Sequence, residues 1–267
     1  MTHKKTELSD LVSRASEKHP DDLWGIAEDP SREQSAADAG VLFSPDDPFP
    51  LLDLKTHTYK QAQAHAAQVD AWLGLNIRDV EHKLQLKTQS DFEKREQWVG
   101  LDPAALLTPY LEIRYLLNAL NLQPGQKVID LGAGYARMGF VMGRHYPEAS
   151  FVGYEIAAER VKEGNRVLAQ QNFSCVKLIE QDLSKMSFIL GADEESLADF
   201  YFIYDFGTIN SIKKAMLDLQ DIAVKKKITI IGRGRACRDQ IERNQPWLSQ
   251  IVEPEHHGNF SIYRSHV

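Results

Sequence analysis

The sequence predicts an α/β protein with a seven-stranded, mostly parallel sheet, a closing antiparallel hairpin and an α-helical N-terminal cap. Three observations support this fold class. From about residue 108 onward, short apolar runs alternate with helical segments, as expected for a parallel sheet. The last two apolar runs follow one another with only a short connection, which is typical of a hairpin. A glycine turn directly after the first apolar run indicates a ligand site at the end of that strand.

Composition separates the N-terminal region from the rest of the chain. Of the 267 residues 43% are hydrophobic and the net charge is −7, while residues 1–110 hold 12 Lys and Arg against 19 Asp and Glu. The polar stretch 1–50, with its Pro and Gly residues, is expected to be partly extended or disordered. Helices expected over about 58–73 and 77–99 would form the cap. We therefore expect an acidic, mainly helical region at 1–107 and a second domain at 108–267.

The composition also limits the partners. An acidic front half repels phosphate groups, so nucleic acid is a disfavoured partner. The basic run 225–227 is interpreted as a solvated helix end. No window approaches the roughly 20 apolar residues that span a bilayer, and Cys175 and Cys237 are too few for a disulfide framework. These features favour a cytoplasmic protein without a membrane partner, and they leave the oligomeric state unpredicted.

Two helix-start signals precede the first strand of the sheet. Asp102-Pro103 and Thr108-Pro109 each put a capping side chain before a proline at the first helical position. The second helix has apolar residues at helical spacing, which should pack on the edge of the sheet. These residues are Ile113, Leu116, Leu117 and Leu120. The helix is expected to end at Gln123-Pro124-Gly125, because proline and glycine interrupt helices there.

The remaining sequence supplies the strands and helices of the sheet domain. Strands are expected at about 128–131, 150–156, 175–180, 200–204, 228–232, 250–253 and 259–263. Helices are expected at about 136–145, up to 171, from 210 to 224 and at 238–247. The connection His256-His257-Gly258 is interpreted as the hairpin loop, because adjacent histidines are not spaced to bind one metal ion.

The glycine turn after the strand at 128–131 identifies the kind of ligand. A dinucleotide-binding turn, G-x-G-x-x-G, would need its third glycine at Arg137, so that register fails. The alternative register has an acid two residues before the first glycine and a small residue two after the second. Asp130, Gly132, Gly134 and Ala136 fill its four positions. A phosphate-binding P-loop is excluded because no Gly-Lys-Ser/Thr follows.

This register resembles the first motif of class I, Rossmann-like S-adenosylmethionine-dependent methyltransferases. Glu155 lies at the end of the next strand, 23 residues after Gly132, where a carboxylate can accept hydrogen bonds from both ribose hydroxyls. Asp182 follows the third strand, where relatives read the adenine edge with an acid and the next backbone N–H. The resemblance implies that S-adenosyl-L-methionine is the cofactor. It also implies cofactor contacts for the neighbouring residues Ala133, Ile156 and Leu183.

A closer resemblance links two short segments to the Dot1-like and mitochondrial-type protein-lysine methyltransferases. The segments are Thr108-Pro109-Tyr110 before the first strand and Gly153-Tyr154-Glu155 at the end of the second. This resemblance implies that Thr108 or Tyr110 closes over the methionine end of the cofactor. Helix capping alone is the competing role for Thr108.

The fourth motif, Tyr204-Asp205-Phe206-Gly207, decides the chemistry in this family. It departs from the Asn/Asp-Pro-Pro-Tyr of many amine-nitrogen methyltransferases, which removes the best reason to expect methylation of a base or a glutamine. Asp205 is a candidate catalytic residue that positions or deprotonates an amine or hydroxyl, or else it caps the helix starting near Asn210. Tyr204, also a candidate catalytic residue, could form an aromatic wall with Tyr110 and Phe206, or all three could belong to the core.

A metal-dependent, catechol-type mechanism is disfavoured, and no metal ligand is predicted. Enzymes of that type need an Asp-Asn pair after the fifth strand, where this chain has Gly232-Arg233-Gly234-Arg235, and arginine does not ligate Mg²⁺. The two arginines either hold an anionic substrate group or pair with nearby acids.

The sequence therefore predicts an S-adenosylmethionine-dependent methyltransferase that acts on an amine or hydroxyl. The acceptor is expected to be a protein, with a lysine side chain as the first candidate, or a small molecule. Two alternatives remain: a non-catalytic protein that binds the cofactor, and an aminopropyl-type transferase on the same fold.

Overall fold

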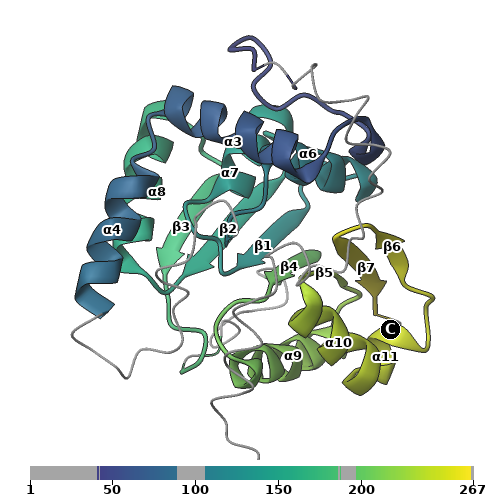
Figure 1. Cartoon of the computed structure of the whole chain (residues 1–267). Helices are drawn as coiled ribbons and strands as arrows, with labels where there is room; N and C mark the ends of the chain where they lie inside the picture. Colours follow the sequence, from purple (N-terminus) through teal and green to yellow (C-terminus); the bar gives the residue numbers. More distant parts are fainter. Residues whose placement is uncertain (1–40, 42, 89–105, 186, 188–196, 266–267) are drawn as a thin grey trace, which may run out of the picture. The chain divides into compact units, whose positions relative to one another are not determined.

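The sheet consists of seven strands in the order β3-β2-β1-β4-β5-β7-β6 (Figure 1). The computed structural model describes residues 41, 43–88, 106–185, 187 and 197–265, and the structural statements below refer to them. The strands are β1 Lys127–Leu131, β2 Ser150–Glu155, β3 Val176–Glu180, β4 Phe200–Tyr204, β5 Thr229–Arg233, β6 Glu255–His257 and β7 Phe260–Arg264. β1 to β5 pair in parallel, whereas β7 is antiparallel to both of its neighbours. The predicted fold class is confirmed.

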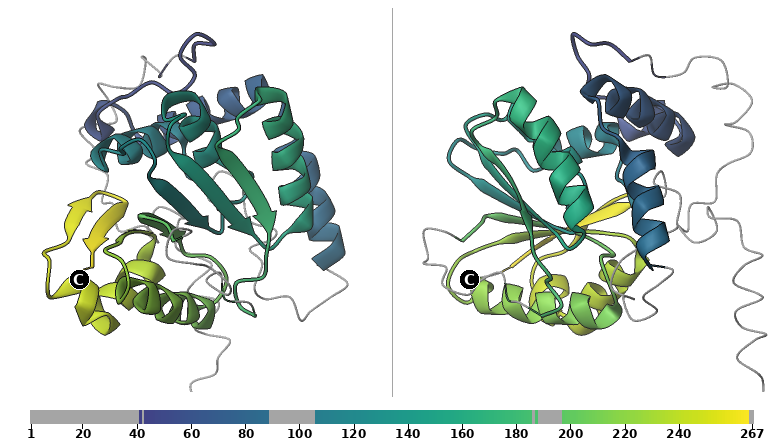
Figure 2. Two further views of the ribbon diagram at one scale, coloured as in Figure 1. Left: turned by 180° about the vertical axis from the view of Figure 1, so that it is seen from behind. Right: turned by 90° about the vertical axis from the view of Figure 1, so that its left-hand side faces the viewer.

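Helices cover both faces of the sheet (Figure 2). They are α3 Tyr59–Leu73, α4 Ile77–Thr88, α6 Tyr110–Ala119, α7 Arg137–His145, α8 Ala158–Gln171, α9 Ile209–Ala223, α10 Arg235–Asn244 and α11 Pro246–Ser249, with a short 3₁₀ turn, η2 Leu54–Thr56. In β1, Val128 belongs to the core on the side of α7, while Ile129 and Leu131 belong to the core on the side of α9. Because both faces are covered, the strand reads as a continuous apolar run.

The cap helices α3 and α4 share the core of the sheet domain. Thr58 and Gln61 form a reciprocal capping box at the start of α3, and Gly74 ends the helix in the left-handed conformation. Val69 and Leu84 are buried in the same cluster as Val128 of β1. Residues 38–267 form one compact unit, so the expected boundary after residue 107 does not divide it.

The expected hairpin is shifted toward the C-terminus. Gln250 is the C-terminal cap of α11, and the expected strand at 250–253 does not form. His256 and His257 belong to β6 and not to the connection, which is Gly258-Asn259. Gly258 has a φ of +55°, and a two-residue connection with positive φ matches the twist of paired strands.

Two expectations about the helix before β1 also need correction. α6 begins after Pro109, whose position is the N-cap, and Thr108 makes no capping hydrogen bond there. The helix ends at Ala119, before the expected Gln123-Pro124-Gly125. Its apolar residues Ile113, Leu116 and Leu117 are buried in the core of the sheet domain. α4 is described over Ile77–Thr88; the rest of the helix expected over 77–99, and the signal Asp102-Pro103, lie outside the described residues. No described helix is long and apolar enough to cross a membrane.

Candidate functional site

The glycine turn is held against the neighbouring strand β2. The backbone N–H groups of Gly132 and Ala133 both donate to the carbonyl oxygen of Tyr154, each at 2.9 Å. Gly132 has a φ of +93°, and a Cβ there would lie 2.7 Å from the Cβ of Phe206. A side chain at this position would therefore be both strained and blocked.

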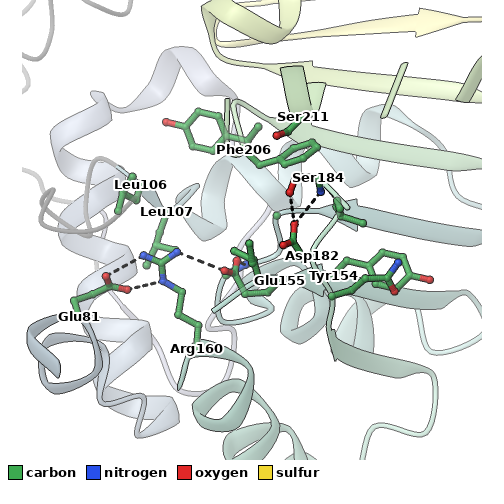
Figure 3. A pocket seen from close by; sticks show the side chains of 17 residues that line it. Glu81, Leu106, Leu107, Tyr154, Glu155, Arg160, Asp182, Ser184, Phe206 and Ser211 are labelled. Carbon is green, nitrogen blue, oxygen red and sulfur yellow. Dashed lines mark hydrogen bonds and ion pairs between the residues drawn. The ribbon is translucent and has the colours of Figure 1, made fainter. Parts of the chain in front are cut away.

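Two adjacent cavities open at the carboxyl ends of the strands, where ligands bind in open α/β sheets. The larger cavity contains many of the residues singled out from the sequence, together with Phe206 (Figure 3). Those predicted site residues are Gly132, Gly134, Glu155, Ile156, Asp182, Leu183 and Tyr204. The smaller cavity is lined by the predicted residues Thr108, Asp130 and Ala133, and it shares Gly132 and Tyr204 with the larger one.

Glu155 is fixed by backbone donors on both sides. Its carboxylate Oε2 accepts a hydrogen bond from the Gly134 N–H at 2.9 Å, and Oε1 accepts one from the Ala157 N–H at 2.9 Å. The residue is only 4% exposed. A carboxylate oxygen can accept two hydrogen bonds, so each oxygen keeps capacity for one further donor from the cavity.

Asp182 also lines the larger cavity (Figure 3). Its carboxylate accepts hydrogen bonds from the Ser184 N–H and hydroxyl and pairs with Lys185 at 2.9 Å. Burial raises the pKa of Asp182, but these bonds from Ser184 and Lys185 outweigh it and lower the pKa below its usual value. Asp182 is therefore an ionised acceptor at neutral pH.

Asp130 is the acid of the smaller cavity. Burial, and secondarily the negative charge of Glu155, raise the pKa of Asp130 to about 8. This carboxyl is consequently largely protonated at neutral pH, and a cationic ligand would favour its ionised form.

Tyr110 does not lie where the resemblance placed it. Its side chain is completely buried, it lines neither of the two cavities, and its hydroxyl donates to Asp70 of α3 at 2.7 Å. Arg137 binds the same Asp70 and also donates to the carbonyl oxygens of Leu107 and Thr108. The expected contact of Tyr110 with the cofactor, and its place in an aromatic wall, are therefore wrong, whereas Thr108 remains at the cavity.

Asp205 is turned away from both cavities. Its two carboxylate oxygens accept hydrogen bonds from the backbone N–H groups of Ala236 and Cys237, at 3.2 and 2.7 Å. Asp205 thus caps α10, and not α9 as the capping hypothesis proposed. The close approach is possible because residue 234 is glycine: it has a φ of +86°, and a Cβ there would lie 2.4 Å from the carboxylate of Asp205. This geometry does not fit the predicted catalytic role of Asp205.

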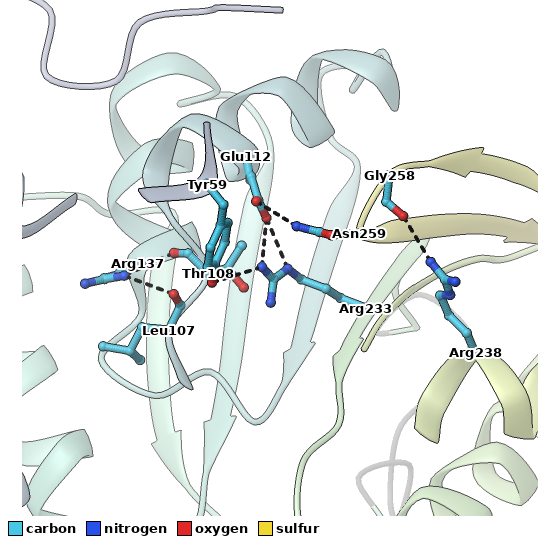
Figure 4. Close-up of polar contacts among 9 residues, drawn as sticks. All are labelled: Tyr59, Leu107, Thr108, Glu112, Arg137, Arg233, Arg238, Gly258 and Asn259. Atoms are coloured by element: carbon cyan, nitrogen blue, oxygen red, sulfur yellow. Dashed lines mark hydrogen bonds and ion pairs between the residues drawn. The ribbon is translucent and has the colours of Figure 1, made fainter. Parts of the chain in front are cut away.

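Arg233 is engaged with an acid and is not available to an anionic substrate. It is 2% exposed, and its guanidinium donates to Glu112 of α6 at 2.9 and 3.1 Å (Figure 4). It also lies over the ring of Tyr204, 4.3 Å from the centroid. Arg235, with a side chain 79% exposed, pairs with Asp239 at 3.7 Å. The interpretation that both arginines pair with nearby acids is confirmed.

Two residues of the larger cavity were not singled out from the sequence. Arg160 of α8 forms a bidentate pair with Glu81 of α4 and approaches Glu155 (Figure 3). Arg160 follows Glu155 by five residues, in the first turn of the next helix, which is a local signal that could have drawn attention to it. Glu81 has no local signal, because it reaches the site only through the packing of the cap.

Comparison with known proteins identifies the class. A family model described as a methyltransferase domain matches residues 122–243, which contain β1 to β5 and the glycine turn. Together with the fold, this match indicates a class I, Rossmann-like methyltransferase domain at residues 122–243, whose cofactor is S-adenosylmethionine. The match indicates an enzyme, as the sequence predicted. No curated protein matches the chain.

Several solved structures are similar in fold. An RNA methyltransferase from Salinibacter ruber in complex with S-adenosyl-L-homocysteine is 18% identical, with a TM-score of 0.42, over 60% of this chain and 92% of that one. A SAM-dependent methyltransferase from Aquifex aeolicus is 14% identical, with a TM-score of 0.43, over 58% and 90% of the two chains. TrmN from Thermus thermophilus is 12% identical, with a TM-score of 0.44, over 60% and 49%.

Proposed function

We propose that the enzyme transfers the methyl group of S-adenosylmethionine to an amine, with a protein lysine side chain as the first candidate acceptor. The observation that carries this proposal is the charge of the cavity walls. Among the described lining residues the acids Glu81, Glu155 and Asp182 outnumber the bases Arg137 and Arg160, and Asp130 adds a carboxyl group that a cationic ligand would ionise. An acidic site attracts a cationic cofactor and a lysine-bearing segment.

The residues of the larger cavity fit the adenosine part of the cofactor. Glu155 has one spare acceptor position on each oxygen, as a ribose diol requires. Asp182 is suited to accept from the adenine amino group, and the backbone N–H of Leu183 to donate to the ring. The apolar side chains of Ile156 and Leu183 would pack against the base.

The smaller cavity fits the methionine part. Asp130 is suited to the methionine ammonium group, with Thr108 and the backbone at Ala133 beside it. The cofactor supplies an electrophilic methyl group on a sulfonium, so the protein has to orient a neutral nucleophile and exclude water. Tyr204, which lines both cavities, is the best-placed side chain at their junction.

The acceptor amine has to lose its proton before transfer, because an ammonium ion has no lone pair. Asp205 is occupied by the N-terminus of α10 and does not reach the cavities. Burial raises the pKa of Tyr204, so its hydroxyl stays protonated and can orient the amine but does not remove a proton at neutral pH. We infer that the proton leaves to solvent and that Tyr204 orients the amine.

Radiolabelled methyl transfer into a cell extract tests the proposal. The extract is separated into protein, nucleic-acid and small-molecule fractions, and Glu155→Ala is the inactive control. We expect label in protein, released as methyllysine on hydrolysis. Label only in the small-molecule or nucleic-acid fraction would overturn the protein acceptor, and label on another side chain would overturn lysine.

A further inference from the structure

We propose that Arg160 and Glu81 are positioning residues for the cofactor, because Glu81 on cap helix α4 fixes Arg160 beside the carboxylate of Glu155. The inference rests on the proposed role of Glu155 as the ribose acceptor. It makes the N-terminal cap a part of the cofactor site, although the cap lies far from the methyltransferase motifs in the sequence.

The Arg160–Glu81 contact is a bidentate ion pair. Arg160 Nε donates to Glu81 Oε1 at 2.8 Å and Arg160 Nη2 donates to Oε2 at 3.0 Å. This planar, two-bond arrangement fixes the orientation of a guanidinium better than a single contact does. The third nitrogen, Nη1, lies 3.6 Å from Oε1 of Glu155 (Figure 3).

Glu81 also contacts the glycine turn. The hydroxyl of Tyr135, the residue after Gly134, donates to Glu81 Oε1 at 2.8 Å. One carboxylate of the cap therefore joins the glycine turn to the first turn of α8. Glu155 bridges the same two segments through the N–H groups of Gly134 and Ala157. The two acids hold the ribose end of the cavity from opposite sides.

The electrostatics give Arg160 a specific task. Glu81, Glu155 and Asp130 are buried acids close to one another, and Arg160 is a buried cation between two of them. Burial lowers the pKa of Arg160, but the hydrogen bonds and charges of Glu81 and Glu155 outweigh it and raise the pKa, so the guanidinium stays charged. Without this cation the Glu155 carboxylate would be left in a buried, negatively charged environment with fewer restraints on its orientation.

The chain offers a matched ion pair at the same interface. Arg166, also on α8, binds Glu163, which in turn accepts a hydrogen bond from the N–H of Asn76 before α4. This pair joins α8 to the cap as the Arg160 pair does, but its residues do not line the larger cavity. Arg166→Gln and Glu163→Gln therefore remove a cap contact without touching the cofactor site.

Calorimetry with two ligands separates positioning from stability. The ligands are S-adenosylhomocysteine and its 2′-deoxyribose counterpart, titrated into the full chain. We expect Arg160→Gln to weaken the binding of S-adenosylhomocysteine about 30-fold. The ratio of the affinities for the two ligands should then approach one, because the lost interactions are those with the ribose. Glu81→Gln should weaken the binding of S-adenosylhomocysteine about 5-fold. The double variant, Arg160→Gln with Glu81→Gln, should bind it no more weakly than Arg160→Gln alone. Both control variants should stay within 2-fold.

The affinities of these variants distinguish a positioning role of Arg160 from a merely structural one. An Arg160→Gln variant that weakens both ligands by the same factor, or that behaves like Arg166→Gln, would overturn the positioning role. If Arg160→Gln does not fold, Arg160→Lys, which keeps the charge without the bidentate geometry, gives the same comparison with a smaller expected loss of about 5-fold. A wild-type protein that does not distinguish the two ligands would instead overturn the ribose role of Glu155, and with it the premise.

Discussion

The ends of β1 to β3 and the ends of β4 and β5 use their charged residues in opposite ways. After β2 and β3, Glu155 and Asp182 lie on the wall of the larger cavity and keep acceptor capacity for a ligand. After β4 and β5, Asp205 caps α10 and Arg233 binds Glu112. In the proposed function the first region binds the cofactor through its charges, whereas the charges of the second hold the protein together. The proposed transfer near Tyr204 accordingly depends on positioning and not on a charged acid or base.

The local cause of the difference is the turn that follows each strand. Glu155 is followed by the start of α8, and its carboxylate meets N–H groups on both sides while still facing the cavity. Asp205 lies next to Gly234, where the missing Cβ lets the first turn of α10 approach its carboxylate. A carboxylate at the carboxyl end of a parallel strand can thus have either of two different tasks.

The largest expected effect comes from breaking the Arg233–Glu112 pair. Arg233→Leu leaves Glu112 buried without its cation, so the free energy of unfolding should fall by about 3–5 kcal/mol, measured by urea denaturation. Arg235→Leu, two residues away and exposed, should change it by less than about 0.5 kcal/mol. Equal effects of the two variants would contradict a structural role for Arg233. If Arg233→Leu does not fold, Arg233→Met with Glu112→Met, which removes both charges, should recover stability.

Asp205 gives the next largest effect. Asp205→Ala removes the cap of α10 and should lower the free energy of unfolding by about 1–2 kcal/mol, as cap removal usually does. Methyl transfer at saturating cofactor should fall less than about 10-fold, which corresponds to less than about 1.4 kcal/mol in the barrier. The exposed Asp221 on α9 supplies the control, Asp221→Ala. A loss of transfer above 100-fold without loss of stability would restore the catalytic role.

The pH dependence of cofactor binding tests the ligand-facing acids at the ends of β1 to β3. Asp130 has a pKa of about 8 without ligand, and a cationic ligand lowers that pKa, so binding releases a proton. The affinity should rise about 10-fold per pH unit as the pH approaches 8 and level off above it. Calorimetry across pH 6–9 measures this slope. Asp130→Asn should abolish it, whereas Asp182→Asn should keep it, because the pKa of Asp182 is lowered and lies outside this range; a slope that survives in Asp130→Asn would assign it to another group.

The smallest expected effect concerns the backbone of the glycine turn. Ala136 has a φ of +64°, a conformation that costs a residue with a Cβ about 1 kcal/mol. Ala136→Gly should raise the free energy of unfolding by about 0.5 kcal/mol, after the entropy lost by glycine on folding. Ala64→Gly, at an exposed position inside α3, should lower it by about 1 kcal/mol. If thermal unfolding shows that both variants are destabilised to the same extent, the strain at Ala136 is contradicted.

The order of strands and helices was predictable because local patterns determine it. Apolar runs that alternate with helical segments predicted β1 to β5 correctly, and the apolar periodicity of residues 58–73 placed α3. The hairpin was misplaced because the apolar residues near 250 belong to α11 and its end, and only the pairing with β7 selects 255–257 as β6. The start of α6 differs from the expected one by one residue, because Pro109 and not Thr108 occupies the N-cap position.

The sequence by itself determined the fold and the cofactor motif. The residues of this motif lie within two consecutive β-α-β units, so their spacing along the chain is enough to recognise them. They are Asp130, Gly132, Gly134, Glu155 and Asp182. Only the tertiary structure decided which charges serve a ligand and which serve the fold, because those partners are distant in the chain. Glu81 and Arg160 are 79 residues apart, and Glu112 and Arg233 are 121 apart. A carboxylate is recognisable from sequence, but its task depends on the donors that packing brings to it.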